Sequence, residues 1–317
     1  MYMKILLVGV LMALVGLIIA LIIGNMVILV LLHDLPWLRL FRQQHDVEMF
    51  KNLSYVPGSV HPKHRLDLYR PKGKKGYPVV VFFHGGYWTT GDKDYYQAFT
   101  GLYANVGVAL ARNGIGVAIA NYRLAPAVAF ESIIGDAAAA VAWTQKHVAD
   151  FDGDPASMFV MGHSAGGHIA ALLAAEPNLL KDAGVPLDHM KGFIALSAIY
   201  DLADMASAND ASFNATVTKP VFGSAPDALT KWSPIAHFRL GTPPLLMLTG
   251  EKDFAYLLPQ AERAQRTLEE LHAQPVAFRI PGYSHMDMVM KFGRDKDETL
   301  RRVLDFTSGG GSGVSRR

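Results

Sequence analysis

Short apolar runs alternate along most of the chain with stretches whose apolar residues recur at helical spacing. The short runs predict strands buried on both faces, and they cover 79–83, 116–120, 158–161, 192–196, 245–249 and 276–280. The segment 64–70 alternates apolar and polar residues, as a strand near a sheet edge does. Helices are predicted between these strands, over 133–148, 166–175, 257–272 and 295–306. This order predicts an α/β fold with a mostly parallel central sheet covered by helices on both faces.

The longest apolar run lies at the N-terminus. Residues 5–32 contain no charged side chain and a single polar amide, that of Asn25. A helix needs about 20 apolar residues to cross a bilayer core, whereas the apolar part of a cleaved signal peptide spans about 7–15 residues. Residues 1–33 are therefore predicted to form one transmembrane helix that anchors the protein in a membrane. A cleaved or core-buried helix is the alternative.

The rest of the chain is predicted to have three parts. Residues 34–60 are interpreted as a connector, 61–306 as the folded α/β domain, and 307–317 as a flexible tail because of the sequence SGGGSG at 308–313. Within the α/β domain, 205–236 has the least regular pattern and is predicted to lie over the sheet, facing the substrate.

Charge and cysteine content exclude several kinds of function. The formal net charge is +2 and no long run of Lys and Arg occurs, so nothing indicates nucleic-acid binding. The sequence has no cysteine, which excludes disulfides, thiolate zinc sites and a cysteine nucleophile.

The sequence Gly162-His163-Ser164-Ala165-Gly166 matches G-x-S-x-G and stands between a predicted strand and a predicted helix. In that context the motif forms a sharp turn that exposes the serine hydroxyl at the edge of the sheet. Glycines are needed there because a side chain would collide with neighbouring backbone. We therefore predict that Ser164 is a nucleophile. The alternative, a chance match in a glycine-rich chain, is disfavoured by the flanking strand and helix.

A second motif, HGGYW at 84–88, directly follows the apolar run 79–83. Acyl transfer needs hydrogen-bond donors where the oxyanion of the tetrahedral intermediate forms. The backbone N–H groups of Gly85, Gly86 and Ala165, the residue after the serine, are predicted to be these donors. The histidine of the motif is predicted to order the loop.

A serine nucleophile needs a base, and in this fold an acid and then a histidine follow the serine along the chain. Asp253 and His285 each follow one of the last two apolar runs, where the carboxyl ends of the strands should meet. We predict that they are the acid and the base. Glu251 and Asp201 are the rivals for the acid, and Asp201 is better interpreted as a loop-ordering group.

Together, HGGYW at 84–88, NYRLAP at 121–126, GHSAGG at 162–167 and the late Asp253 and His285 resemble the α/β-hydrolase esterases of the hormone-sensitive-lipase-like type. The likeness covers roughly 60–305 and is greatest to the HGGxW branch, which includes kynurenine formamidases, isoprenylcysteine methylesterase-like enzymes and microbial carboxylesterases. It implies a serine hydrolase without metal or cofactor. Asn121 departs from the family, which has an acidic residue there.

These observations predict a membrane-anchored carboxylesterase that acts on small or medium acyl or aryl esters. An aryl-formamidase or amide hydrolase is the first alternative, since a serine, a histidine and an aspartate can together cleave an ester bond or an amide bond. A catalytically silent binding module of the same fold is the second. The side chains of Tyr87, Trp88, Phe254 and Met286 are predicted to line an apolar substrate pocket, with ordinary core packing as the alternative.

Overall fold

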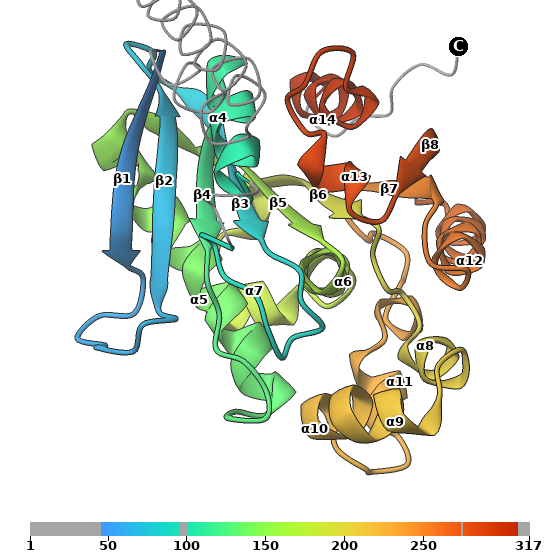
Figure 1. Ribbon diagram of the computed structural model, residues 1–317. Helices are drawn as coiled ribbons and strands as arrows, with labels where there is room; N and C mark the ends of the chain where they lie inside the picture. Colours follow the sequence, from blue (N-terminus) through green and yellow to red (C-terminus); the bar gives the residue numbers. More distant parts are fainter. Residues whose placement is uncertain (1–45, 96–100, 274, 310–317) are drawn as a thin grey trace, which may run out of the picture.

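The computed structural model describes residues 46–95, 101–273 and 275–309. These residues form a central eight-stranded sheet with the order β1-β2-β4-β3-β5-β6-β7-β8 (Figure 1). β1 and β2 run antiparallel to their neighbours, and the strands from β4 to β8 are parallel to one another. The strands are β1 (Val47–Ser54), β2 (Arg65–Pro71), β3 (Tyr77–Phe83), β4 (Gly116–Ala120), β5 (Gly153–His163), β6 (Met190–Leu196), β7 (Leu245–Lys252) and β8 (Val276–Ser284).

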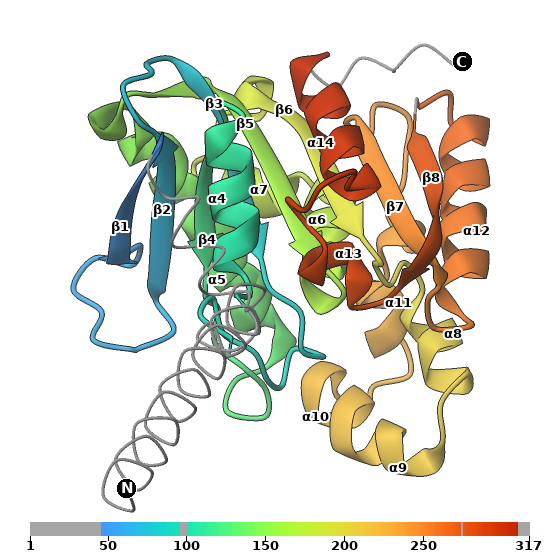
Figure 2. The same cartoon turned by 45° about the horizontal axis from the view of Figure 1, so that its top comes forward.

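Helices cover both faces of the sheet, as predicted (Figures 1 and 2). The helices α4 (Ala104–Arg112), α13 (Asp287–Met290) and α14 (Glu298–Ser308) bury one face, and α5 (Phe130–His147), α6 (Ala165–Ala175) and α12 (Leu257–Glu270) bury the other. The result is two apolar cores separated by the sheet. Together with the strand order, this arrangement is the α/β-hydrolase fold.

Two of the longer elements were not predicted. β1 lies inside the stretch 34–60, which was interpreted as a connector, and it pairs with β2 at the edge of the sheet. α4 was not predicted: it is only nine residues long, and Gly107 and its two valines have weak helix propensity.

The segment after β6 consists of short helices at the carboxyl ends of the strands. Figure 1 shows these helices grouped below the sheet. The buried Gln260 of α12 fixes the start of the segment, since its Oε1 accepts the backbone N–H groups of Tyr200 and Asp201. The ring of Phe213 lies 5.3 Å from that of Tyr87 in the HGGYW loop. The helices are α8 (Leu202–Ser207), α9 (Ala211–Phe213), α10 (Lys219–Phe222) and α11 (Ala228–Trp232).

The predicted N-terminal transmembrane helix lies outside the described residues. Among the helices of 46–95, 101–273 and 275–309, none combines the length and the apolar character needed to span a membrane.

Candidate active site

Ser164 occupies the sharp turn between β5 and α6, with a backbone φ of +57°. The turn is closed tightly: a Cβ on Gly162 would lie 2.0 Å from the carbonyl oxygen of Gly166, and a Cβ on Gly166 would lie 2.1 Å from that of Phe83. The N–H of Ser164 donates to the carbonyl of Leu196 on β6 at 2.9 Å. These contacts hold the serine in a left-handed conformation that costs energy for a residue with a side chain.

Asp253 and His285 meet at the ends of β7 and β8. Nδ1 of His285 lies 2.7 Å from Oδ1 of Asp253. The carboxylate of Asp253 also accepts the N–H of Phe254 at 2.8 Å, and its Oδ2 accepts the hydroxyl of Ser197. Burial alone would raise the pKa of Asp253, but the hydrogen bonds and the charge of His285 outweigh it, so that pKa lies below its ordinary value. The carboxylate is therefore ionised at neutral pH.

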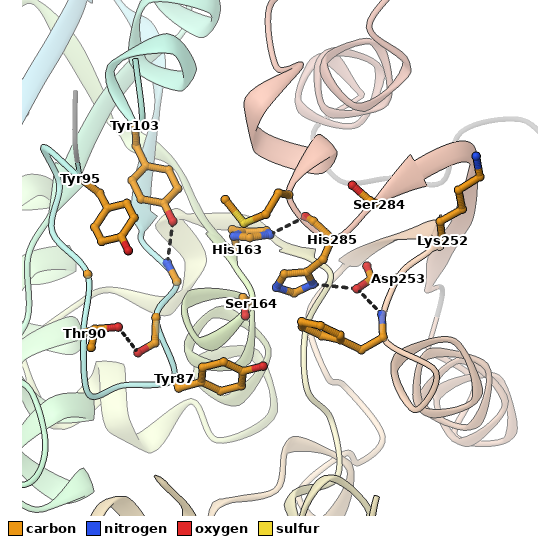
Figure 3. A pocket seen from close by; sticks show the side chains of 15 residues that line it. Tyr87, Thr90, Tyr95, Tyr103, His163, Ser164, Lys252, Asp253, Ser284 and His285 are labelled. Carbon is orange, nitrogen blue, oxygen red and sulfur yellow. Dashed lines mark hydrogen bonds and ion pairs between the residues drawn. The ribbon is translucent and has the colours of Figure 1, made fainter. Parts of the chain in front are cut away.

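A cleft of about 540 Å³ opens at the carboxyl ends of the strands. Ser164, Asp253 and His285 all line it, and Figure 3 shows the side chain of Ser164 beside the imidazole of His285. The structure thus brings together three residues that lie far apart in the sequence. The other residues that line the cleft are Gly85, Gly86, Tyr87, Thr90, Gly91, Tyr95, Tyr103, His163, Lys252, Phe254, Ser284 and Met286.

Three of the four predicted pocket side chains lie in this cleft, namely those of Tyr87, Phe254 and Met286. Phe254 and Met286 remain 41% and 39% exposed, so they form an apolar rim at its mouth. The prediction for Trp88 is wrong. Trp88 is fully buried, and its ring packs against Phe130 and other aromatic side chains in the core beside α6.

The residues predicted to bind the oxyanion, Gly85, Gly86 and Ala165, lie beside the serine, but their backbone N–H groups do not all have the same partners. The N–H of Gly85 donates to the hydroxyl of Tyr103 at 3.2 Å, which directs it away from Ser164. The carbonyl of Gly86 accepts the N–H and the hydroxyl of Thr90, so the following peptide N–H, that of Tyr87, points the opposite way. The N–H of Ala165 belongs to the first turn of α6, where backbone donors have no partner within the helix.

The HGGYW loop is fixed at its start by His84, as predicted for this residue. Nδ1–H of His84 donates to the carbonyl of Gly85 at 2.7 Å, and the hydroxyl of Tyr122 donates to the carbonyl of His84 at 2.9 Å. Burial lowers the pKa of His84 to about 4, so its ring is neutral.

The far end of the same loop is fixed by a buried polar cluster. The ammonium of Lys93 lies 3.0 Å from Oδ1 of Asp67 on β2, and both side chains are almost fully buried. Asn121 accepts the N–H of Lys93 at 2.6 Å and donates to Asp92 at 2.9 Å. The amide of Asn121, the residue after β4, therefore links the end of β4 to the end of this loop.

The rival acids lie elsewhere. Glu251 pairs with Arg279 at 3.0 Å and accepts the N–H of Gly282. Asp201 accepts the N–H of Asp204 and so caps α8. Neither lines the cleft.

The sequence did not identify Ser197, Tyr103 or His163 as site residues. Ser197 is fully buried at the end of β6, with φ +48°. The ring of His163 packs against that of His285. A polar residue that directly follows a buried strand was a usable signal for Ser197, whereas nothing in the sequence indicates the contact made by Tyr103.

No cluster of three or more metal-ligating side chains is present within the described residues. The chemistry that the cleft offers is that of a hydroxyl, an imidazole, a carboxylate and backbone N–H donors.

The chain is similar to several known proteins. The BD-FAE family model matches residues 66–268. The chain is 28% identical over 248 residues to a probable isoprenylcysteine α-carbonyl methylesterase, ICMEL1, from Arabidopsis thaliana, covering 73% of this chain and 50% of that protein. It is 28% identical over 238 residues to the esterase LipC of Mycobacterium tuberculosis, covering 71% of this chain and 57% of LipC. The chain spans about half the length of the curated relatives it matches.

A solved structure is similar over most of the described domain. The hyperthermophilic esterase from Pyrobaculum calidifontis superposes with a TM-score of 0.67 at 25% identity, covering 87% of this chain and 90% of the esterase. The similarity supports the fold described above.

Proposed function

The chain belongs to the BD-FAE family, and from that membership we propose that it hydrolyses carboxylic esters with Ser164 as the nucleophile. The observation that supports this most is the meeting of Ser164 with the hydrogen-bonded pair of Asp253 and His285 in one cleft.

In the proposed reaction His285 accepts the proton of Ser164 while the serine oxygen attacks the ester carbonyl. Asp253 holds the imidazole through Nδ1, which leaves Nε2 for the serine, and it stabilises the imidazolium that forms. The alcohol leaves with the proton carried by His285. A water molecule then attacks the acyl group on Ser164 by the same steps in reverse order.

The oxyanion of each tetrahedral intermediate is proposed to bind the N–H groups of Gly86, Tyr87 and Ala165. Gly85 is left out of this set because its N–H is engaged by Tyr103. Preorganised donors of this kind contribute about 3 kcal/mol each to transition-state stabilisation. The fixed carbonyl of Gly86 and the buried His84 keep the loop in place before the substrate arrives.

The substrate is proposed to be an ester with an apolar group, because the apolar side chains of Tyr87, Phe254 and Met286 line the cleft. Two curated relatives are named as acting on isoprenylcysteine methyl esters, and the exposed rim of Phe254 and Met286 suits a prenyl chain. We therefore propose a prenylcysteine methyl ester as one specific substrate and short acyl esters as a general class of substrates.

The test compares the full chain with Ser164→Ala and with Ser207→Ala, an exposed serine that does not line the cleft. The substrates are p-nitrophenyl acetate, butyrate and octanoate, farnesylcysteine methyl ester and N-formylkynurenine. Loss of the nucleophile should lower kcat by roughly 10⁶-fold on every active substrate. Equal rates for Ser164→Ala and the parent would contradict the assignment of Ser164 as the nucleophile. A parent that hydrolyses none of these esters and does not react with an organophosphonate would contradict the esterase.

We also propose that residues 1–33 tether the protein to a membrane, on the strength of their apolar sequence. The full chain should sediment with membranes and resist extraction at alkaline pH, whereas the chain without residues 1–33 should stay in the supernatant. Equal partitioning of the two chains would contradict the tether.

A further inference from the structure

His163, the second residue of the GHSAG motif, has no part in the proton transfers described above, yet it lies at the centre of the site (Figure 3). We propose that His163 is a positioning residue that holds the backbone of His285 so that the imidazole of His285 stays beside Ser164. The inference rests on the proposed function, which makes His285 the base.

The first support is a hydrogen bond that crosses the site. Nε2 of His163 lies 3.0 Å from the carbonyl oxygen of His285, 122 residues away in the sequence. A carbonyl only accepts, so Nε2 carries the proton. Burial, together with the charge of His285, lowers the pKa of His163 to about 3. The ring therefore remains a neutral donor when His285 gains a proton.

The second support is packing on the base itself. The rings of His163 and His285 have centroids 4.7 Å apart, and the ring of Phe254 lies 4.5 Å from that of His285. With Asp253 bound at Nδ1, the imidazole of His285 is held by one hydrogen bond and two ring contacts. The contact from His163 comes from the residue next to the nucleophile.

The third support is the position of the base in the sheet. Ser164 follows β5 in the interior of the sheet, whereas His285 follows β8 at its edge. β6 and β7 lie between them, and adjacent strands are about 4.8 Å apart. A base must lie about 3 Å from the hydroxyl that it deprotonates. The bond from His163 joins the two segments directly, so their separation does not depend on the intervening strands alone.

The side of His163 that faces the oxyanion loop leaves little freedom. Nδ1 is buried without a hydrogen-bond partner within the described residues, and it would lie 3.2 Å from a Cβ on Gly85. The ring is thus wedged between the HGGYW loop and the segment that carries the base. The ring of His163 therefore contributes both packing against its neighbours and one hydrogen bond, from Nε2 to the carbonyl of His285.

The experiment compares His163→Gln, His163→Asn and His163→Leu in the full chain. The amide nitrogen of glutamine reaches the place of Nε2, whereas that of asparagine reaches only the place of Nδ1. His168→Leu is the matched control, because His168 is also fully buried and neutral and donates from Nε2 to a carbonyl, that of Trp232, outside the cleft. The assays are kcat and KM on p-nitrophenyl butyrate and the low-field proton resonance of the hydrogen bond between Asp253 and His285.

His163→Gln should keep kcat within about threefold, while His163→Asn and His163→Leu should lose about 10²-fold in kcat with little change in KM, as expected for a base displaced by about 1 Å. The low-field resonance should persist in the parent, in His163→Gln and in His168→Leu, and disappear in the other two variants. The inference is overturned if His163→Gln loses as much kcat as His163→Leu does. It is also overturned if His163→Asn or His163→Leu retains both the kcat and the low-field resonance of the parent. If the parent cleaves no ester, the proposed function is refuted instead. The low-field resonance then still tests whether the hydrogen bond from His163 positions His285.

Discussion

Replacing Ser197 by alanine removes the hydroxyl that donates to Oδ2 of Asp253. The remaining donor to that oxygen is the N–H of Gly250, at 3.3 Å. A hydrogen bond to a charged group contributes about 1.5–3 kcal/mol. If the whole of this is lost when His285 becomes charged, the rate falls by roughly 10- to 150-fold, since 1.36 kcal/mol corresponds to a factor of ten. Because Gly250 retains part of the interaction, we expect a decrease of about tenfold.

The decrease should appear in kcat and not in KM. Ser197 is fully buried and does not line the cleft, so it has no contact through which to change substrate binding. Alanine isolates the hydroxyl, because it has the same Cβ as serine and tolerates the backbone at φ +48° equally. Steady-state kinetics on a p-nitrophenyl ester, with thermal unfolding to show that the variant is folded, measures both constants.

Two results would refute this reasoning. A kcat within about twofold of the parent would mean that Asp253 is held adequately without the hydroxyl. An increase in KM at constant kcat would mean that Ser197 shapes the cleft and has no effect on the acid.

Three further predictions concern neighbouring parts of the site. Tyr103→Phe removes the acceptor of the N–H of Gly85 and should lower kcat/KM by about two- to tenfold, the size of one neutral hydrogen bond; an unchanged kcat/KM would show that the bond is dispensable. Trp88→Ala should destabilise the protein by about 3–5 kcal/mol in urea unfolding while the folded enzyme keeps its KM, because Trp88 is a core residue. A raised KM would show instead that Trp88 contributes to the substrate pocket. The pKa of Asp253 is lowered by folding, so its contribution to stability is present above the pKa of about 3.9 of an unfolded aspartate and is lost as the pH falls through the lower folded value. Urea unfolding at pH 6 and pH 3 should therefore show a smaller loss of stability on acidification for Asp253→Asn than for the parent, and equal losses would contradict the lowered pKa.

The sequence predicted most of the fold because burial on both faces makes a strand visible as a continuous apolar run. β4 was predicted at its observed bounds, and β3, β6 and β7 within a few residues. α4 was missed because it is short and contains a glycine and two β-branched valines, which are weak helix formers. β1 was missed because its residues are only partly buried or exposed, so the apolar signal of an interior strand is absent.

The site was predictable where chemistry depends on order along the chain, and less so where it depends on contacts in space. The positions of Ser164, Asp253 and His285 follow from motifs at the ends of strands. The engagement of the Gly85 N–H depends on Tyr103, which arrives from a separate segment. Trp88 looked like a pocket residue because it adjoins the oxyanion loop, yet aromatic partners from distant elements draw it into the core.

The edge position of β8 has a consequence for how this protein would respond to heat. Among the strands of the described residues, β8 pairs with β7 alone, and within β8 Ile280 is the buried residue. Segments with few buried contacts open locally at a lower free energy than the core does. Opening of β8 would carry His285 away while Ser164 and the two cores remained folded. Thermal inactivation would then precede unfolding of the sheet, and hydrogen exchange in β8 would follow the loss of activity more closely than exchange in β5.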